Sequence, residues 1–191
     1  MRKPNVLLTV LLFTAYPIII FFGLKVLEPR YVAVSLAVIL IFRWKQDAQR
    51  FVSLLSKLNF IILAALLVLI CITFITNSET LLRVFPAVMN LGMLLLFGLS
   101  LVKPPSMIEM FARIRRPDLP PSAVAYTRKV TRVWCVFFIV NGSIAVYTAF
   151  YASQDTWSLY NGLIAYVAMG MLIAGELLVR HYMIARETSG K

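Results

Sequence analysis

The stretch LNFIILAALLVLICITFI (58–75), the turn TNSE (76–79) and the run TLLRVFPAVMNLGMLLLFGLSLV (80–102) together decide the fold of this chain. Each apolar run has about 20 residues, which as an α-helix rising ~1.5 Å per residue crosses a hydrocarbon core of ~30 Å. Ser78 is suited to cap the second helix, which we expect to run from about Glu79 to Val102. The stretch therefore predicts two antiparallel membrane-spanning helices joined by a short turn.

Four further apolar segments flank this hairpin. The first, Val6 to Val26, is too long for a signal peptide and lacks a cleavage site, so we interpret it as a retained anchor. The second, Tyr31 to Phe42, covers only ~18 Å as a helix, and Pro29 and Trp44 extend it slightly. We expect a short span there, with a re-entrant hairpin as the alternative. The last two form a hairpin whose second helix runs from about Thr156 to Val179. The sequence thus predicts an all-α polytopic membrane protein with six transmembrane helices.

The distribution of positive charge predicts the topology. Sixteen of the nineteen Lys and Arg residues lie before the first segment or after the second, fourth and sixth, whereas only Lys25, Arg30 and Arg83 lie in the other gaps. Cytoplasmic loops carry such an excess of basic residues, so both termini should be cytoplasmic. The net charge of +11 then reflects orientation and attraction to anionic lipid head groups, and we expect no nucleic acid as a partner.

Composition indicates one transmembrane helical domain over 1–191, because 61% hydrophobic residues and a mean hydropathy of +0.85 exceed the range of soluble domains. The longest polar stretch is a cytoplasmic loop at 103–133. Within it, Met107, Met110, Phe111 and Ile114 share one face, from which charged residues such as Glu109 turn away, and we expect an amphipathic helix at the membrane surface. Lys45 to Lys57 predicts a second interfacial helix. Two caps are also expected, Ser122 for the fifth span and Asp155 for the sixth.

Catalytic motifs are lacking in the sequence, which has no Gly-rich phosphate loop, no paired His and no Cys-x-x-Cys. We therefore predict no metal and no cofactor, and an enzyme is the weakest functional class. The lone His181 is juxtamembrane, flanked by Arg180 and Tyr182, and we interpret it as an interfacial residue.

Polar residues inside the spans are the candidates for function, because lipid burial of such groups costs free energy. Glu176 precedes Arg180 by four residues, which suits an ion pair or a site for a proton or substrate, and we expect it to face the bundle interior beside Asn141. Two amides are further candidates, which could also join helices by hydrogen bonds: Asn141 and Asn161. Four tyrosines could line a cavity or form an aromatic belt at the membrane interface: Tyr147, Tyr151, Tyr160 and Tyr166. Gly170 and Ala174 form a small-residue step, and Gly142 adds a second point of close approach; both favour packing. Asn90 could satisfy the backbone freed by Pro86.

A family resemblance is carried by several of these motifs. They are Met107-Ile108-Glu109, Ala112-Arg113, Pro117-Asp118-Leu119-Pro120-Pro121, Tyr126-Thr127-Arg128-Lys129-Val130-Thr131, Trp134, Phe137-Phe138, Asn141, Trp157, Tyr160-Asn161-Gly162, Tyr166 and Gly175-Glu176. This pattern resembles a family of bacterial inner-membrane proteins similar to, but distinct from, intracellular septation protein A. The resemblance implies association with genes for aryl polyene or xanthomonadin-like lipids, and so an accessory role in making or moving such a lipid. It implies no catalytic residues.

Three functional classes remain open at this point. The first is a non-enzymatic accessory that docks cytoplasmic lipid-synthesis enzymes or an acyl carrier protein; the second is a small transporter or flippase; the third is an enzyme acting on a lipid head group. The docking hypothesis rests on the basic residues of the 103–133 loop, which could bind an acidic protein or anionic lipid. These residues are Arg113, Arg115, Arg116, Arg128, Lys129 and Arg132. The oligomeric state is not predicted.

Overall fold

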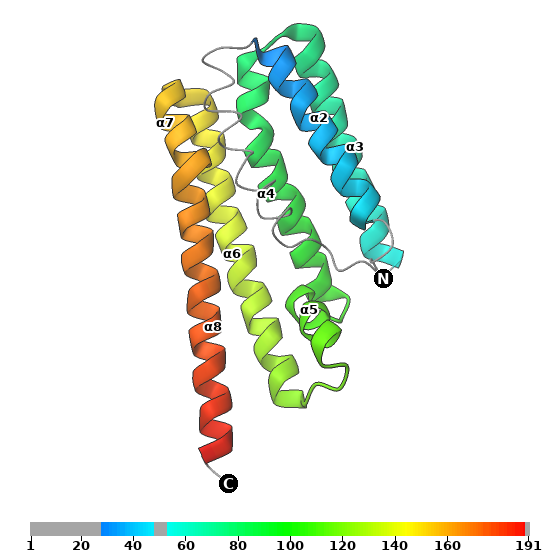
Figure 1. The fold of residues 1–191 in the computed structure, drawn as a ribbon, viewed down its shortest axis with the longest axis vertical. Coiled ribbons are helices and arrows are strands. Elements are labelled where there is room, and N and C mark those ends of the chain that lie inside the picture. The colour runs from blue at the N-terminus through cyan, green and yellow to red at the C-terminus, as the bar shows by residue number, and fades with distance from the viewer. Residues whose placement is uncertain (1–27, 48–52, 190–191) are drawn as a thin grey trace.

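The computed structural model describes residues 28–47 and 53–189, and every regular element in these two ranges is helical (Figure 1). The elements are α2 (Pro29–Asp47), α3 (Ser53–Thr76), α4 (Glu79–Val102), α5 (Met107–Arg115), α6 (Pro121–Tyr151), α7 (Gln154–Leu159), the π-helical segment η1 (Tyr160–Ile164) and α8 (Ala165–Ser189). The all-α prediction is confirmed for these residues. The first predicted segment, Val6 to Val26, lies outside them.

The long helices lie side by side and alternate in direction, with α4 between α3 and α6 (Figure 1). One end of the bundle, the basic end, holds α5, the start of α6 and the end of α8. The opposite end holds α7 and the first turns of α2 and α4. Three described helical stretches are long and apolar enough to cross a membrane, namely Glu79–Val102, Pro121–Tyr151 and Gln154–Tyr182, and Phe60–Thr76 is a shorter apolar one.

The turn between α3 and α4 also holds the start of α2. Ser78 caps α4 as predicted, because its hydroxyl oxygen accepts a hydrogen bond from the Leu81 amide at 3.4 Å. Asn77 adopts a left-handed backbone conformation with φ of 50°, which asparagine tolerates better than most residues. Its side-chain oxygen accepts a hydrogen bond from the Arg30 amide at 3.1 Å, so it satisfies a free donor in the first turn of α2.

The segment around residues 29–57 differs from its prediction. Pro29–Asp47 is one continuous helix of 19 residues, about 28 Å long, so the re-entrant hairpin is wrong. A separate surface helix over Lys45 to Lys57 is also wrong, because its first residues end α2 and its last residues, from Ser53, begin α3. Helices extend past their apolar stretch because the backbone hydrogen bonds continue into the polar flank.

Two predicted helix caps are also wrong. α6 begins at Pro121 with Pro120 as its N-cap, so Ser122 lies inside the first turn. Proline suits the first helical position, because its missing N–H is a donor that would lack a helical partner there. Ser153, and not Asp155, is the N-cap of α7, because its hydroxyl oxygen accepts a hydrogen bond from the Thr156 amide at 3.2 Å.

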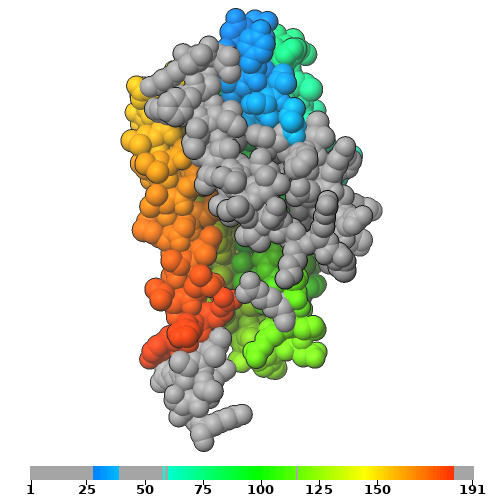
Figure 2. All heavy atoms as spheres, viewed as in Figure 1, coloured from blue at the N-terminus to red at the C-terminus, as the bar shows by residue number. Residues whose placement is uncertain are grey.

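α8 is the least packed of the long helices and forms one edge of the molecule (Figure 2). Only 6% of its most apolar stretch is buried inside the bundle, against 39% for α4. Gly170 and Ala174 are exposed, and no atom lies within 4 Å of a Cβ built at Gly170. This step therefore does not pack against another helix of the described chain. The close approach predicted at Gly142 of α6 is confirmed, because a Cβ built there would lie 3.1 Å from Cβ of Asn90 on α4.

Candidate functional site

A chain of polar side chains joins α4, α6 and η1 at the middle of the bundle. The Tyr160 hydroxyl donates to Asn141 Oδ1 at 2.9 Å, and Asn141 Nδ2 donates to Asn90 Oδ1 at 3.0 Å. Asn90 Nδ2 in turn donates to the Pro86 carbonyl at 2.8 Å, which confirms that it satisfies the backbone freed by the proline. Asn141 therefore joins helices, and its amide is committed to neighbours within the chain.

Asn161 makes a second interhelical contact near the opposite end. Its Nδ2 donates to Thr148 Oγ1 of α6 at 3.1 Å and to the Trp157 carbonyl at 3.0 Å, and the side chain is buried. It lies in η1, where the helix widens to a π turn. Such turns accommodate irregular contacts with neighbouring helices. The amide of Asn161 fixes the start of α8 against α6.

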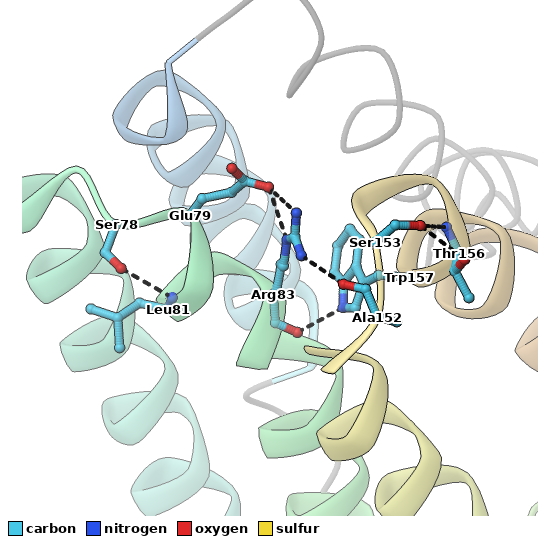
Figure 3. A network of polar contacts seen from close by, with 8 residues as sticks. All are labelled: Ser78, Glu79, Leu81, Arg83, Ala152, Ser153, Thr156 and Trp157. Carbon is cyan, nitrogen blue, oxygen red and sulfur yellow. Dashed lines mark hydrogen bonds and ion pairs between the residues drawn. The ribbon is translucent and has the colours of Figure 1, made fainter. Parts of the chain in front are cut away.

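A third polar network closes the opposite end of the bundle (Figure 3). Arg83 Nε donates to Glu79 Oε1 at 2.9 Å, and Arg83 Nη1 donates to the Ala152 carbonyl at 3.3 Å. The Trp157 indole N–H donates to the Arg83 carbonyl at 3.0 Å, and this indole is 1% exposed. These contacts tie the first turn of α4 to the α6–α7 turn. The i, i+4 spacing of Glu79 and Arg83 is a signal that the sequence offers for this pair.

Both described cations at the opposite end are thus neutralised by acidic neighbours. Arg83 pairs with Glu79, and Arg30 Nε lies 2.6 Å from Glu28 Oε2. Two arginines at the basic end are paired with carboxylates as well, so the positive charge of that end comes from its larger number of Lys and Arg residues.

At the basic end, α5 is held between α4 and α6 by hydrogen bonds to its first turn. The Met107 amide donates to Ser100 Oγ of α4 at 2.9 Å, and the Ile108 amide donates to Thr131 Oγ1 of α6 at 3.3 Å. The Ser106 amide donates to Glu109 Oε2 at 3.3 Å. These bonds satisfy donors that a helix start leaves free, so α5 occupies a fixed place in the fold.

The faces of α5 differ from the prediction. Glu109 was expected to turn away from the apolar face, but it is buried, with its side chain 8% exposed, while Ile114 is 78% exposed. Arg113 explains the buried carboxylate, because its Nε and Nη2 donate to Glu109 Oε1 at 2.9 and 2.7 Å. Arg113 Nη1 also donates to the Pro117 carbonyl at 2.8 Å. Arg113 therefore fixes the turn after α5 and is not a free docking cation.

The remaining basic residues fall into two groups. Arg128 Nη2 donates to the Leu101 carbonyl at 3.2 Å, so it satisfies the C-terminal end of α4. Arg115 ends α5, and its side-chain surroundings lie outside the described part of the chain. The second group is exposed and has no acidic or hydrogen-bonding partner among the described residues; it consists of Lys103, Arg116, Lys129 and Arg132. We call these four residues the basic platform.

Glu176 lies at the basic end and not beside Asn141. The Tyr126 hydroxyl donates to the backbone carbonyl of Glu176 at 3.3 Å, and Tyr126 lies fifteen residues, or about 22 Å of helix, from Asn141. The predicted proximity of Glu176 and Asn141 is therefore wrong. The Glu176 side chain is 18% exposed, and its Oε1 lies 3.9 Å from Arg180 Nε, so these two side chains form the expected i, i+4 pair.

The tyrosines do not gather around one cavity. Tyr147 and Tyr151 are 63% and 79% exposed, with ring centroids 5.5 Å apart on the outer surface of α6. Tyr160 faces inward and is committed to Asn141, and Tyr166 is half-buried. Exposed tyrosines near a helix end suit a membrane interface. The described residues contain no group of three or more His, Cys, Asp or Glu that could hold a metal ion.

Long apolar helices, amides bonded to one another inside the bundle and cations gathered at one end define a helical membrane protein. The comparison with curated proteins agrees. The chain is 30% identical over 175 residues to the inner membrane-spanning protein YciB of Hydrogenovibrio crunogenus, covering 89% of this chain and 79% of that protein. The chain belongs to the family of this inner membrane-spanning protein. No family model and no solved structure matches it.

Proposed function

We propose that this protein is a multi-pass, non-enzymatic accessory protein of the bacterial inner membrane, with its basic end and both termini in the cytoplasm. It supports synthesis or export of an envelope lipid by docking a cytoplasmic enzyme or carrier protein at the membrane. Membership in the family of the YciB protein, an inner membrane-spanning protein, supports the proposed location in the inner membrane. An aryl polyene as the lipid is supported by the resemblance of the motifs alone.

One observation carries the docking role, namely that the cations of the basic platform are unpaired while the backbone that bears them is fixed. Lys103, Arg116, Lys129 and Arg132 are exposed without acidic partners among the described residues. The helices that bear them are fixed by Ser100, Thr131 and Glu109. Unpaired cations on a fixed backbone favour an acidic protein partner, because their charges are available to acidic groups and no backbone segment has to be ordered on binding. Acyl carrier proteins have acidic docking faces of this kind.

The polar groups within the bundle support a structural role for the transmembrane part. Asn90, Asn141 and Tyr160 form one bonded chain, and Asn161 bonds to Thr148 and to the backbone. Amides committed in this way join helices in membranes. They favour an accessory over a transporter whose polar path would run through these residues.

The orientation predicts the result of reporter fusions. A fluorescent protein that matures only in the cytoplasm, fused after Lys191, should be fluorescent in whole cells. Alkaline phosphatase, which needs the periplasm, should be inactive at that position and active when inserted in the turn between Thr76 and Ser78. The reason is that sixteen of the nineteen Lys and Arg residues lie in the segments assigned to the cytoplasm, and loops rich in these residues stay there. Phosphatase activity after Lys191 would reverse the topology.

The docking role predicts the behaviour of a triple variant, Arg116→Gln, Lys129→Gln and Arg132→Gln. We expect binding of a purified acyl carrier protein to the full-length protein in phosphatidylcholine nanodiscs to weaken about tenfold, as three exposed charge contacts of ~0.5 kcal/mol each would give. Wild-type binding should also weaken as salt rises from ~0.05 to ~0.5 M, because screening shortens the reach of exposed charges. Biolayer interferometry would measure both effects.

The matched control for this experiment is Arg30→Gln, which removes a cation at the opposite end. It should leave carrier binding at the wild-type level. Equal binding by the triple variant and the wild type at low salt would contradict the docking role. If the triple variant instead loses only co-purified anionic lipid, the platform binds head groups and not a protein.

A further inference from the structure

The α6–α8 junction at the basic end shows a different kind of polar arrangement from the basic platform. The Tyr126 hydroxyl of α6 donates to the backbone carbonyl of Glu176 on α8, so these two residues lie at the same height along the bundle. The contact leaves both Glu176 carboxylate oxygens free for other partners. No hydrogen bond to this carboxylate comes from the residues that the structure describes, and the nearest cation, Arg180 Nε, stays 3.9 Å away.

Glu176 and Arg180 therefore lie close together without a direct hydrogen bond between them, and we call this an open pair. Elsewhere in the described chain, the i, i+4 pairs Glu79–Arg83 and Glu109–Arg113 are joined by direct N–H···O bonds. Arg180 is 46% exposed and Glu176 is 18% exposed at the side chain, so a ligand can reach both. An open pair of opposite charges presents one anionic and one cationic group to the same approaching molecule.

The surroundings of this pair are apolar and accessible from the side of the bundle. No atom lies within 4 Å of a Cβ built at Gly175, so the space beside Glu176 is open. Ile173 and Leu177 on the same helix are 44% and 45% exposed. In a membrane, these side chains contact acyl chains, and Glu176 and Arg180 then lie at the level of the head groups.

We infer that Glu176 and Arg180 form a head-group site for a zwitterionic phospholipid with a primary amine, the ethanolamine class. The ammonium donates to the Glu176 carboxylate, and the phosphate accepts from the Arg180 guanidinium. The two charges of such a head group are adjacent and of opposite sign, as are those of the pair. The acyl chains lie along Ile173 and Leu177. This inference does not depend on the docking role of the basic platform.

The test is lipid retention by the full-length protein, read by native mass spectrometry after exchange into detergent. The protein is incubated with equal amounts of phosphatidylethanolamine, phosphatidylcholine and phosphatidylglycerol with identical acyl chains. We expect the ethanolamine lipid to be retained about fivefold over the glycerol lipid, which lacks the ammonium. It should also exceed the choline lipid, whose methylated ammonium carries no N–H donor.

The variant Glu176→Gln keeps the side-chain shape and should bring the ethanolamine-to-glycerol ratio close to one. Arg180→Gln should reduce retention of all three lipids, because each of them has a phosphate. The control Glu28→Gln removes a carboxylate at the opposite end and should keep the wild-type ratio. An unchanged ratio in Glu176→Gln overturns the inference. Equal retention of the three lipids by the wild type overturns it as well, and that measurement does not depend on the folding of any variant.

Discussion

Replacing Trp157 by Ala is expected to lower the free energy of unfolding by about 3 kcal/mol, a large effect for a single side chain in a protein of this size. The indole is 1% exposed and belongs to a buried cluster with residues of α2, α3, α4 and α6. Its N–H bonds the Arg83 carbonyl. Truncation leaves a cavity where four helices meet and also an unpaired carbonyl. Urea or thermal unfolding in detergent, followed by circular dichroism, would measure the loss.

Two further variants separate the contributions of the indole. Trp157→Phe keeps an aromatic ring and removes the N–H donor, so it should cost only ~1 kcal/mol. Tyr151→Ala truncates an aromatic side chain of the same hairpin that is 79% exposed, and it should leave the unfolding midpoint near the wild-type value. If Trp157→Ala unfolds at the wild-type midpoint, Trp157 does not hold the opposite end together.

The bounds of α4 could be predicted from the sequence because local signals mark both ends. Ser78 supplies a cap in front of the apolar run, and Lys103 with two prolines follows it, so the prediction of Glu79 to Val102 is confirmed to the residue. The boundary between α2 and α3 has no comparable stop before Asp47 or after Ser53. Hydrophobic patterning alone placed a surface helix there, whereas the backbone continues as helix into both flanks.

The surroundings of individual side chains were harder to predict than the helices. The prediction of which face of α5 is buried was wrong, because apolar periodicity assigns every charged residue to the outside. The Glu109 carboxylate can be buried because it pairs with Arg113 and accepts a hydrogen bond from the Ser106 amide. Glu176 was placed at the wrong level because the sequence contains no information on the register of α8 against α6. That register is set by contacts between distant residues, of which Tyr126 to Glu176 is one.

For Asn90 and Asn141, in contrast, the structure agrees with the role predicted from the sequence. The sequence indicated that each amide could satisfy a neighbour, and the structure adds that they bond to each other. This contact requires α4 and α6 to approach closely, which the sequence signals only through Gly142. A glycine directly after an amide permits that approach because it has no Cβ.

The contribution of this close approach can be measured with Gly142→Leu. A Cβ at this position would lie 3.1 Å from Cβ of Asn90, and the longer side chain cannot fit without separating α4 from α6. We expect a loss of about 2–3 kcal/mol in unfolding free energy, from overpacking together with the weakened Asn90–Asn141 hydrogen bond. The same unfolding measurement in detergent would detect it.

Gly170→Leu is the matched control, because it makes the same substitution on another long apolar helix where no atom lies within 4 Å of the added Cβ. Leucine favours helix over glycine by up to ~1 kcal/mol, so this variant should be as stable as the wild type or slightly more stable. A difference between the two variants then reports packing at Gly142 and not helix propensity, which changes in the same direction in both. If Gly142→Leu is as stable as Gly170→Leu, α4 and α6 do not approach as closely in the membrane as the hydrogen bond between Asn90 and Asn141 requires.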